Sequence, residues 1–184
     1  MRTFLVFLAL ILAIVVTPAT HAAAANPFGV RIGNATLATV RQVVGTRTAL
    51  HPAGVSAVTH GPILVGDGHG LGMPDVEHVT FVFDPHGTLQ VVEVRLPNGG
   101  MGYPLFKRYR GLLARRYRTV ADREAFVGEQ YARFVADNAV ITLESPQLSF
   151  DMDLVYASPA AMDEEHRYEL AQQARRRAAE AKGL

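Results

Sequence analysis

The stretch that most constrains the fold runs from Val76 to Leu96, where two apolar arms meet at Asp84–Gly87. Apolar residues recur at every second position of both arms, which is the period of a β-strand with one buried face. Pro85 favours the second position of a type I turn, and Gly87 can take the left-handed conformation that follows it. The sequence therefore predicts a β-hairpin near the centre of an antiparallel sheet.

The chain before this hairpin is predicted to contain an extended lead-in (26–33), a short helix (36–45), short strands between 51 and 65, and a glycine-rich loop (66–75). Thr36 or Asn34 can cap the free amides of the helix, and Gly45 can close it. Prolines and glycines interrupt the β-like stretch and predict a turn at 60–62.

The chain after the hairpin is predicted to contain a helix (103–118), a loop or helical turn (122–128), paired strands (130–136 and 139–145) and a further strand (148–156). Asp137-Asn138 joins the paired strands, and both residues tolerate the positive φ of tight turns. The last strand alternates strictly: its apolar residues are Leu148, Phe150, Met152, Leu154 and Tyr156, separated by polar residues that include Ser149, Asp151 and Asp153. This pattern predicts one buried and one solvated face.

The predicted fold class is α+β, with a mainly antiparallel sheet in a single domain at 26–158. A helix followed by strands occurs twice, at about 26–98 and 99–158, which suggests a tandem duplication. A C-terminal helix (159–184) is predicted to begin at Ser158-Pro159. Its apolar stripe consists mostly of small residues, so we expect this helix to be loosely docked or projecting.

The N-terminus has the pattern of a secretory signal peptide. Arg2 precedes an unbroken apolar run from Phe4 to Val16, which is shorter than the roughly 20 residues that span a bilayer. We assign residues 1–22 to this signal, with cleavage between 22 and 25. The mature chain, without a transmembrane segment, is therefore expected in the periplasm or outside the cell.

Cysteine is absent, so the chain has no disulfide, no thiol nucleophile and no site for lipid attachment after the signal. The formal net charge of the whole chain is +1, and the signal contributes Arg2 and no acid. The mature chain is therefore neutral, which gives no general reason to bind nucleic acid. Any electrostatic recognition must be local.

The segment Ile32–Thr36, followed by Val40 and Val44-Gly45, resembles the opening helix of the β-lactamase-inhibitor-protein-like and SmpA/OmlA-like families of small bacterial envelope proteins. The resemblance implies a helix that precedes an antiparallel sheet, sometimes twice in tandem. It also implies a non-enzymatic role in protein inhibition or in outer-membrane assembly. The lipid-attachment cysteine of the outer-membrane lipoproteins is missing, so membrane tethering is not expected.

Histidines and carboxylates in and around the glycine-rich loop form a candidate metal site for zinc or copper: His60, Asp67, His69, Asp75 and His78. A strand start would place His78 on a rigid element. The alternative is that these are surface loop residues, because the set matches no specific metal motif.

Two further clusters carry charge. Lys107, Arg108, Arg115 and Arg118 fall on one side of the helix predicted at 103–118, as either a face for an anionic partner or a solvated surface. Asp151 and Asp153 share the wet face of one strand, near Glu144, and paired carboxylates can bind calcium or transfer protons.

The chain has no phosphate-binding loop, no G-x-S-x-G and no H-E-x-x-H motif. We therefore predict an exported, soluble, non-catalytic protein that acts in protein interaction or envelope maintenance. Its expected partner is another envelope protein, with peripheral membrane contact left open. A periplasmic metal-binding protein is the first alternative, and a hydrolase with an unrecognised carboxylate site is the second.

Overall fold

The computed structural model describes residues 23–99, 103–125 and 128–182. The predicted signal peptide at 1–22 lies outside the described residues. Eight antiparallel strands form one sheet in the order β1-β2-β3-β4-β8-β7-β6-β5. The strands are β1 (Leu50–Val55), β2 (Pro62–Asp67), β3 (His78–Phe83), β4 (Leu89–Pro97), β5 (Arg118–Arg123), β6 (Gln130–Val135), β7 (Val140–Ser145) and β8 (Asp151–Ala157).

Helices complete the fold: a 3-10 helix η1 (Pro27–Gly29), α1 (Leu37–Val43), α2 (Pro104–Ala114) and α3 (Pro159–Lys182). The predicted class, α+β with a mainly antiparallel sheet and a C-terminal helix, is confirmed. The order of elements repeats, because α1 precedes the meander β1–β4 and α2 precedes the meander β5–β8. The last strands of the two halves, β4 and β8, pair with each other at the centre of the sheet. This pairing extends from Val91 opposite Ala157 to Pro97 opposite Asp151.

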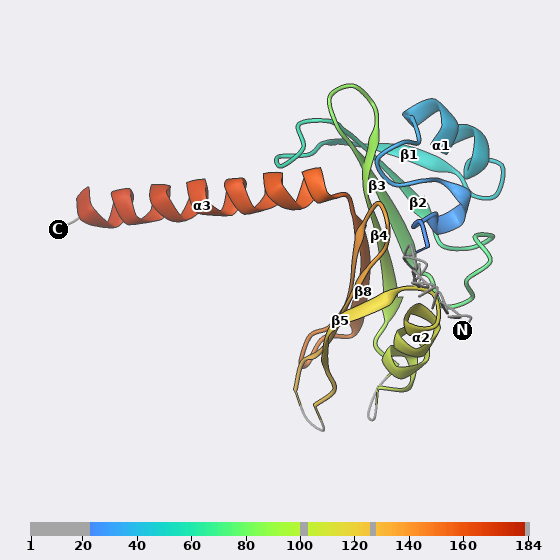
Figure 1. Cartoon of the computed structure of the whole chain (residues 1–184). Coiled ribbons are helices and arrows are strands. Elements are labelled where there is room, and N and C mark those ends of the chain that lie inside the picture. The colour runs from blue at the N-terminus through green and yellow to red at the C-terminus, as the bar shows by residue number, and fades with distance from the viewer. Residues whose placement is uncertain (1–22, 100–102, 126–127, 183–184) are drawn as a thin grey trace, which may run out of the picture.

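The helices α1 and α2 cover one face of the sheet, and the core lies between that face and the two helices (Figure 1). The predicted hairpin is β3–β4, and its alternation is confirmed: Val79, Phe81, Phe83, Val92, Val94 and Leu96 are fully buried. Val40 of α1 and Phe106 of α2 pack into the same core. Burial of such aromatic and aliphatic side chains contributes roughly 1.5–3 kcal/mol each.

The opposite face of the sheet, here called the open face, carries the alternate side chains of the same strands. They are mostly half-buried and polar at the centre, and include Thr80, Glu93, Arg95, Tyr131, Arg133, Thr142, Glu144 and Asp153. The helix α3 leaves the sheet on the side away from α1 and α2 (Figure 1). The open face is therefore bordered at one end by the first turns of α3.

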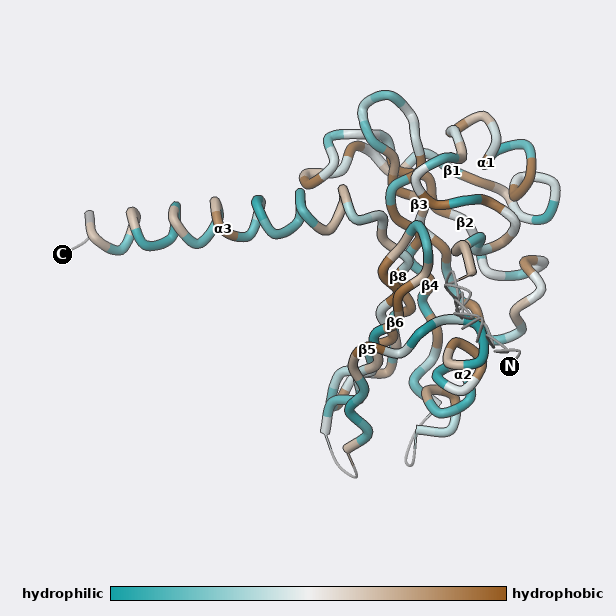
Figure 2. The backbone as a smooth tube through the Cα atoms, in the orientation of Figure 1, coloured by the Kyte–Doolittle hydropathy of each residue, from teal (hydrophilic) through white to brown (hydrophobic). Residues whose placement is uncertain are grey.

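The start of α3 is fixed to the sheet, and the rest projects. Ser158 Oγ accepts a hydrogen bond from the N–H of Ala161 (3.0 Å) and donates to the side chain of Gln90. Ala161 is buried, whereas the helix beyond it is hydrophilic along most of its length (Figure 2). In the described part of the chain, no helix has the length and apolar character needed to cross a membrane.

Two predicted segments have a different structure. The edge strand β5 lies where the sequence predicts the end of a helix (103–118) and a loop or helical turn (122–128). All its side chains are exposed, so it lacks the apolar alternation that reveals a strand, and pairing with β6 holds it. The predicted extended lead-in contains η1, where Val30 N–H donates to Pro27 O (3.1 Å).

The turn between β6 and β7 lies at Asp137-Asn138 as predicted, but neither residue has a positive φ. Asn138 has another role, because its side chain bonds the N-terminal segment. Its Oδ1 accepts from Ala25 N–H (2.7 Å), and its Nδ2 donates to Ile32 O (2.7 Å). This turn therefore ties the second half of the chain to the segment that precedes α1.

Candidate functional site

The turn between β7 and β8, here called the hairpin tip (Pro146–Phe150), contradicts the predicted alternation. Leu148 is 93% exposed and Phe150 is 92% exposed, although both were expected on the buried face. The strand β8 begins only at Asp151, and burial then alternates as expected, with Met152 and Leu154 in the core. Two large apolar side chains therefore stand in solvent at the end of a hairpin from the sheet centre.

Hydrogen bonds hold the hairpin tip in place. The buried Asn98 donates from its backbone N–H to Phe150 O (2.7 Å) and from its side chain to Ser149 O (2.8 Å). Its Oδ1 accepts from the hydroxyl of the buried Ser145 (2.7 Å). Ser149 adds two more bonds within the tip, accepting from Asp151 N–H at its hydroxyl (3.0 Å) and donating to Pro146 O (3.3 Å). The exposed side chains are thus presented on a defined backbone.

Leu148 has a φ of 62°, in the left-handed region. For a residue with a β-carbon this conformation costs roughly 1–2 kcal/mol. The side chain of Leu148 gains almost no burial in return. Backbone strain of this kind occurs at functional sites, where the surrounding structure imposes it.

A row of charged residues crosses the open face beside this tip. Arg95 on β4 is opposite Asp153 on β8, which is opposite Glu144 on β7, which is opposite Tyr131 on β6. Arg95 Nε donates to Asp153 Oδ1 (3.2 Å), and its guanidinium lies 3.6 Å from Glu93. We call Glu93, Arg95, Glu129, Glu144 and Asp153 the acidic band.

Carboxylates exceed cations within the acidic band. Burial raises the pKa of Glu93, and the charge of Asp153 raises it further against the opposing effect of Arg95. Burial also raises the pKa of Glu144, and the neighbouring Glu129 and Asp153 raise it further against the opposing charge of Arg123, which pairs with Glu129 (2.7 Å). Both carboxylates are thus less stable as anions than free glutamate, and a cation from outside would stabilise them.

Arg133 lies next to this band on β6, two residues from Tyr131. Its guanidinium is 5.6 Å from the centroid of the Tyr131 ring. Its Nε is buried without a hydrogen-bond partner, and no ion pair joins it to a described carboxylate. A planar guanidinium stacked on an aromatic ring is a frequent element of protein-binding surfaces.

The five residues predicted as a metal site do not converge. His69 Nδ1 contacts the Asp67 carboxylate, and His78 is opposite Asp67 in the pairing of β2 with β3. Asp75, in contrast, accepts hydrogen bonds from Arg108 (2.8 Å) and from the Tyr109 hydroxyl (3.0 Å).

His60 lies elsewhere, beside Glu164, Arg167 and Tyr168 of α3. No three His, Asp or Glu side chains in residues 23–99, 103–125 and 128–182 form a group that could hold a metal ion. Asp67 and His69 thus contact each other, His78 begins β3, Asp75 bonds to α2, and His60 lies beside α3.

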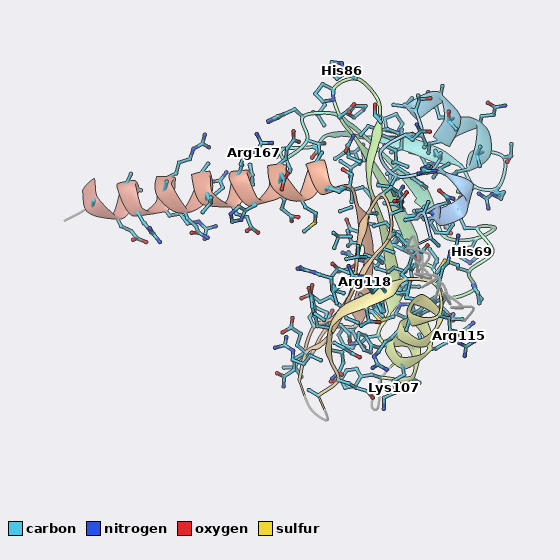
Figure 3. All side chains as sticks on the ribbon, in the orientation of Figure 1. His69, His86, Lys107, Arg115, Arg118 and Arg167 are labelled. Atoms are coloured by element: carbon cyan, nitrogen blue, oxygen red, sulfur yellow. The ribbon has the colours of Figure 1, made fainter. Side chains whose placement is uncertain are left out.

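Two of the four residues of the predicted basic face have a carboxylate partner within the protein. Lys107 pairs with Glu124 (3.3 Å) and Arg108 with Asp75 (2.8 Å). Arg115 follows the end of α2, and Arg118 lies on β5 (Figure 3). The four residues therefore do not form one continuous cationic helix face.

The third prediction, a carboxylate site, is partly reflected in the acidic band, because Asp153 and Glu144 are neighbours. A cavity of about 610 Å³ lies elsewhere, where the two halves meet, and it is lined by residues that include Arg31, Gln90, Asn138 and Ser158. Neither Asp151 nor Asp153 lines it. The paired aspartates thus lie on an open sheet surface and not in that cavity.

Comparisons with family models, with curated proteins and with solved structures found no match. The resemblance of residues 32–45 to small envelope proteins therefore stays a prediction.

Proposed function

We propose that this protein binds another protein without catalysis, through the hairpin tip and the adjacent acidic band. The observation that carries the proposal is the exposure of Leu148 and Phe150 on a backbone fixed by Asn98. Large apolar anchors that enter a partner's pocket supply most of the energy in protein interfaces. A fixed loop also loses little conformational entropy on binding.

The charges next to the tip favour a particular kind of partner. An apolar pocket would receive Leu148 and Phe150, and lysine or arginine side chains beside it would face Glu144 and Asp153. Such cations would offset the burial and the neighbouring charges of Glu129 and Asp153, which together raise the pKa of Glu144. Arg133, stacked on Tyr131, would donate hydrogen bonds to a carboxylate of the partner at the far side of the band.

The signal-like N-terminus supports a partner in the bacterial envelope, and the resemblance of residues 32–45 supports inhibition of, or assistance to, that partner. The five candidate metal residues do not converge, and Asp153 and Glu144 lie on an open sheet surface, so we favour protein binding over metal binding and hydrolysis. Export, periplasmic location and the envelope role are part of the same proposal.

The test is photo-crosslinking in the cells that make the protein. A photoreactive phenylalanine analogue is placed at 148 or at 150, and a matched control carries it at Val55, which is 69% exposed on the edge strand β1. We expect one discrete heteromeric adduct from 148 and 150 and none from 55. An adduct with the mass of two copies of this chain would contradict the proposal, as would equal adducts from all three positions.

The captured protein then allows a quantitative measurement. The double variant L148S/F150S should bind it at least a hundredfold more weakly, since two anchors of about 2 kcal/mol each are lost. The control V55S should bind it like the wild type. Equal affinity of all three proteins would overturn the assignment of the tip.

A further inference from the structure

We propose that the distal part of α3 binds anionic phospholipid surfaces through Arg175, Arg176 and Arg177. This inference is independent of the hairpin tip, which lies at the β7–β8 turn. It concerns a second surface with different chemistry.

The distal part of α3, from Glu169 on, projects from the protein body (Figure 1). From Glu169 to Ala181 every side chain except the half-buried Gln172 is exposed. Between Pro159 and Lys182 the sequence has no glycine and no β-branched residue, and alanine, glutamate, glutamine and arginine predominate. These residues have high intrinsic helix propensity, so the helix can extend into solvent without packing.

Charge is divided along α3. The acids Asp163, Glu164, Glu165 and Glu169 lie in the part near the sheet, while Arg175, Arg176, Arg177 and Lys182 lie in the distal part. After residue 170 the sequence has one acid, Glu180. The order suits the helix dipole, but that effect is confined to the terminal turns, and the arginines begin earlier.

The arginines of α3 differ from the cations of α2 in their surroundings. Lys107 and Arg108 each have a carboxylate partner, at 3.3 and 2.8 Å. Among the described residues, the ion pair recorded within α3 joins Arg167 to Glu164 (3.8 Å), near the sheet. Glu180 lies four residues after Arg176 and three after Arg177, so one acid stands against three guanidinium groups. The predicted anionic-partner surface is therefore better placed on α3 than on α2.

The distribution of the arginines around the helix favours a lipid surface over a folded acidic protein. Consecutive residues of a helix are separated by about 100° around its axis, so the three guanidinium groups do not share one side. A rigid protein surface would reach one side, whereas mobile phospholipid headgroups can gather around the helix and meet all three. Arginine binds phosphate oxygens in a bidentate manner, which suits phospholipid headgroups.

The distal helix offers little apolar surface for insertion. Leu170 is its one large aliphatic side chain, and the remaining apolar residues after it in α3 are alanines. We therefore expect binding at the headgroup level that weakens as salt increases, because screening shortens the range of the attraction.

The experiment is sedimentation of the full-length mature chain with phosphatidylcholine vesicles that either contain or lack phosphatidylglycerol. The wild type should sediment with the vesicles that contain phosphatidylglycerol at low salt. The variant R175Q/R176Q/R177Q, which preserves helix propensity, should bind roughly a hundredfold more weakly. The matched control K107Q/R108Q/R115Q should bind within about twofold of the wild type, since Lys107 and Arg108 are already paired. Circular dichroism of each variant checks that α3 stays helical.

The proposal is overturned if the wild type does not sediment with these vesicles, if both triple variants lose binding equally, or if binding is unchanged by salt. Concentration-dependent dimerisation that is lost in R175Q/R176Q/R177Q, without vesicle binding, would assign the helix to self-association. Binding of a nucleic acid duplex with the same arginine dependence, in place of vesicle binding, would likewise overturn it. None of these results affects the crosslinking test of the hairpin tip.

Discussion

The two halves of the chain end in equivalent hairpins, and their turns differ sharply. The turn between β3 and β4 is polar and closed: Asp84 Oδ1 accepts from the N–H groups of His86 (2.9 Å) and Thr88 (2.8 Å). Gly87 supplies its positive φ of 80° and accepts a hydrogen bond from Leu37 N–H of α1 (2.9 Å). Every residue of this turn suits the folding of the hairpin.

The turn between β7 and β8 occupies the same place in the second half and follows different rules. Leu148 takes the left-handed conformation where the first turn has glycine, and Phe150 stands in solvent. Asn98, from the end of β4, holds this turn from the side. A local choice that opposes folding, in a chain whose other choices agree with the fold, supports the proposal that this turn binds a partner.

The largest effect is expected when the support of the second turn is removed. Asn98→Ala leaves the buried Ser145 hydroxyl and the half-buried Ser149 carbonyl without their side-chain partner. Urea denaturation should show a loss of about 3 kcal/mol, since unpaired buried polar groups cost roughly 1–3 kcal/mol each. The variant should also lose partner binding. A loss below about 0.5 kcal/mol would show that the tip is not fixed by Asn98.

The corresponding change in the first turn should cost less. Asp84→Ala removes an acceptor for His86, Thr88 and the side chain of Gln90, but these donors lie nearer to solvent and can bond to water. We expect a loss of about 1–1.5 kcal/mol in urea denaturation and no effect on partner binding. Equal losses for Asp84→Ala and Asn98→Ala would remove the contrast between the turns.

Backbone strain predicts opposite changes in stability for one substitution in each turn. Gly87→Ala introduces a β-carbon at a positive φ without a clash, as its nearest neighbour is Leu37 Cβ at 3.9 Å, and should destabilise by about 1 kcal/mol. Leu148→Gly removes such strain and should stabilise by about 0.5–1 kcal/mol while weakening partner binding. Thermal and urea unfolding of both variants measures this. Destabilisation by Leu148→Gly would mean that the tip carries no stored strain.

Local patterns in the sequence were enough to predict the first hairpin and the fold class. The alternation around Val79 and Phe83, with Pro85 and Gly87 between the arms, depends on neighbours in the chain, and the structure follows it. Pairing of β4 with β8 joins segments that lie far apart in sequence, and no local pattern encodes it. The strand β5 could not be predicted because its exposed side chains carry no periodic apolar signal.

The candidate site was missed for a related reason. Alternation placed Leu148 and Phe150 with Met152 and Leu154 on the buried face, yet the sheet ends before they are reached. Pro146 and Ser149 were the available signals of a longer turn, since both interrupt strands. The sequence did predict that Asp153 lies near Glu144. It could not show that His60 lies apart from His69, because that depends on which loop packs on α3.

The smallest expected effect is on the pH dependence of stability, which should differ in sign between Asp84 in the first half and Glu144 in the second. In the first turn burial raises the pKa of Asp84, but hydrogen bonds from Thr88, His86 and Gln90 outweigh it and lower the pKa below 3.8. The ionised form is favoured by folding, so this stabilisation is present above the unfolded-state pKa and is lost as pH falls through the folded-state pKa.

Glu144 behaves in the opposite way, because burial and its hydrogen bond to Glu129 raise its pKa above 4.5. The folded protein binds this proton more tightly than the unfolded chain, so the contribution is most favourable below about pH 4.5 and is lost as pH rises through the folded-state pKa. Glu144→Gln should therefore raise the urea midpoint at about pH 7 and leave it nearly unchanged at about pH 4, while Asp84→Asn should lower it at about pH 7. If Glu144→Gln lowered the midpoint at neutral pH, the carboxylates of the acidic band would be balanced by their own arginines, and a cationic partner would have nothing to relieve.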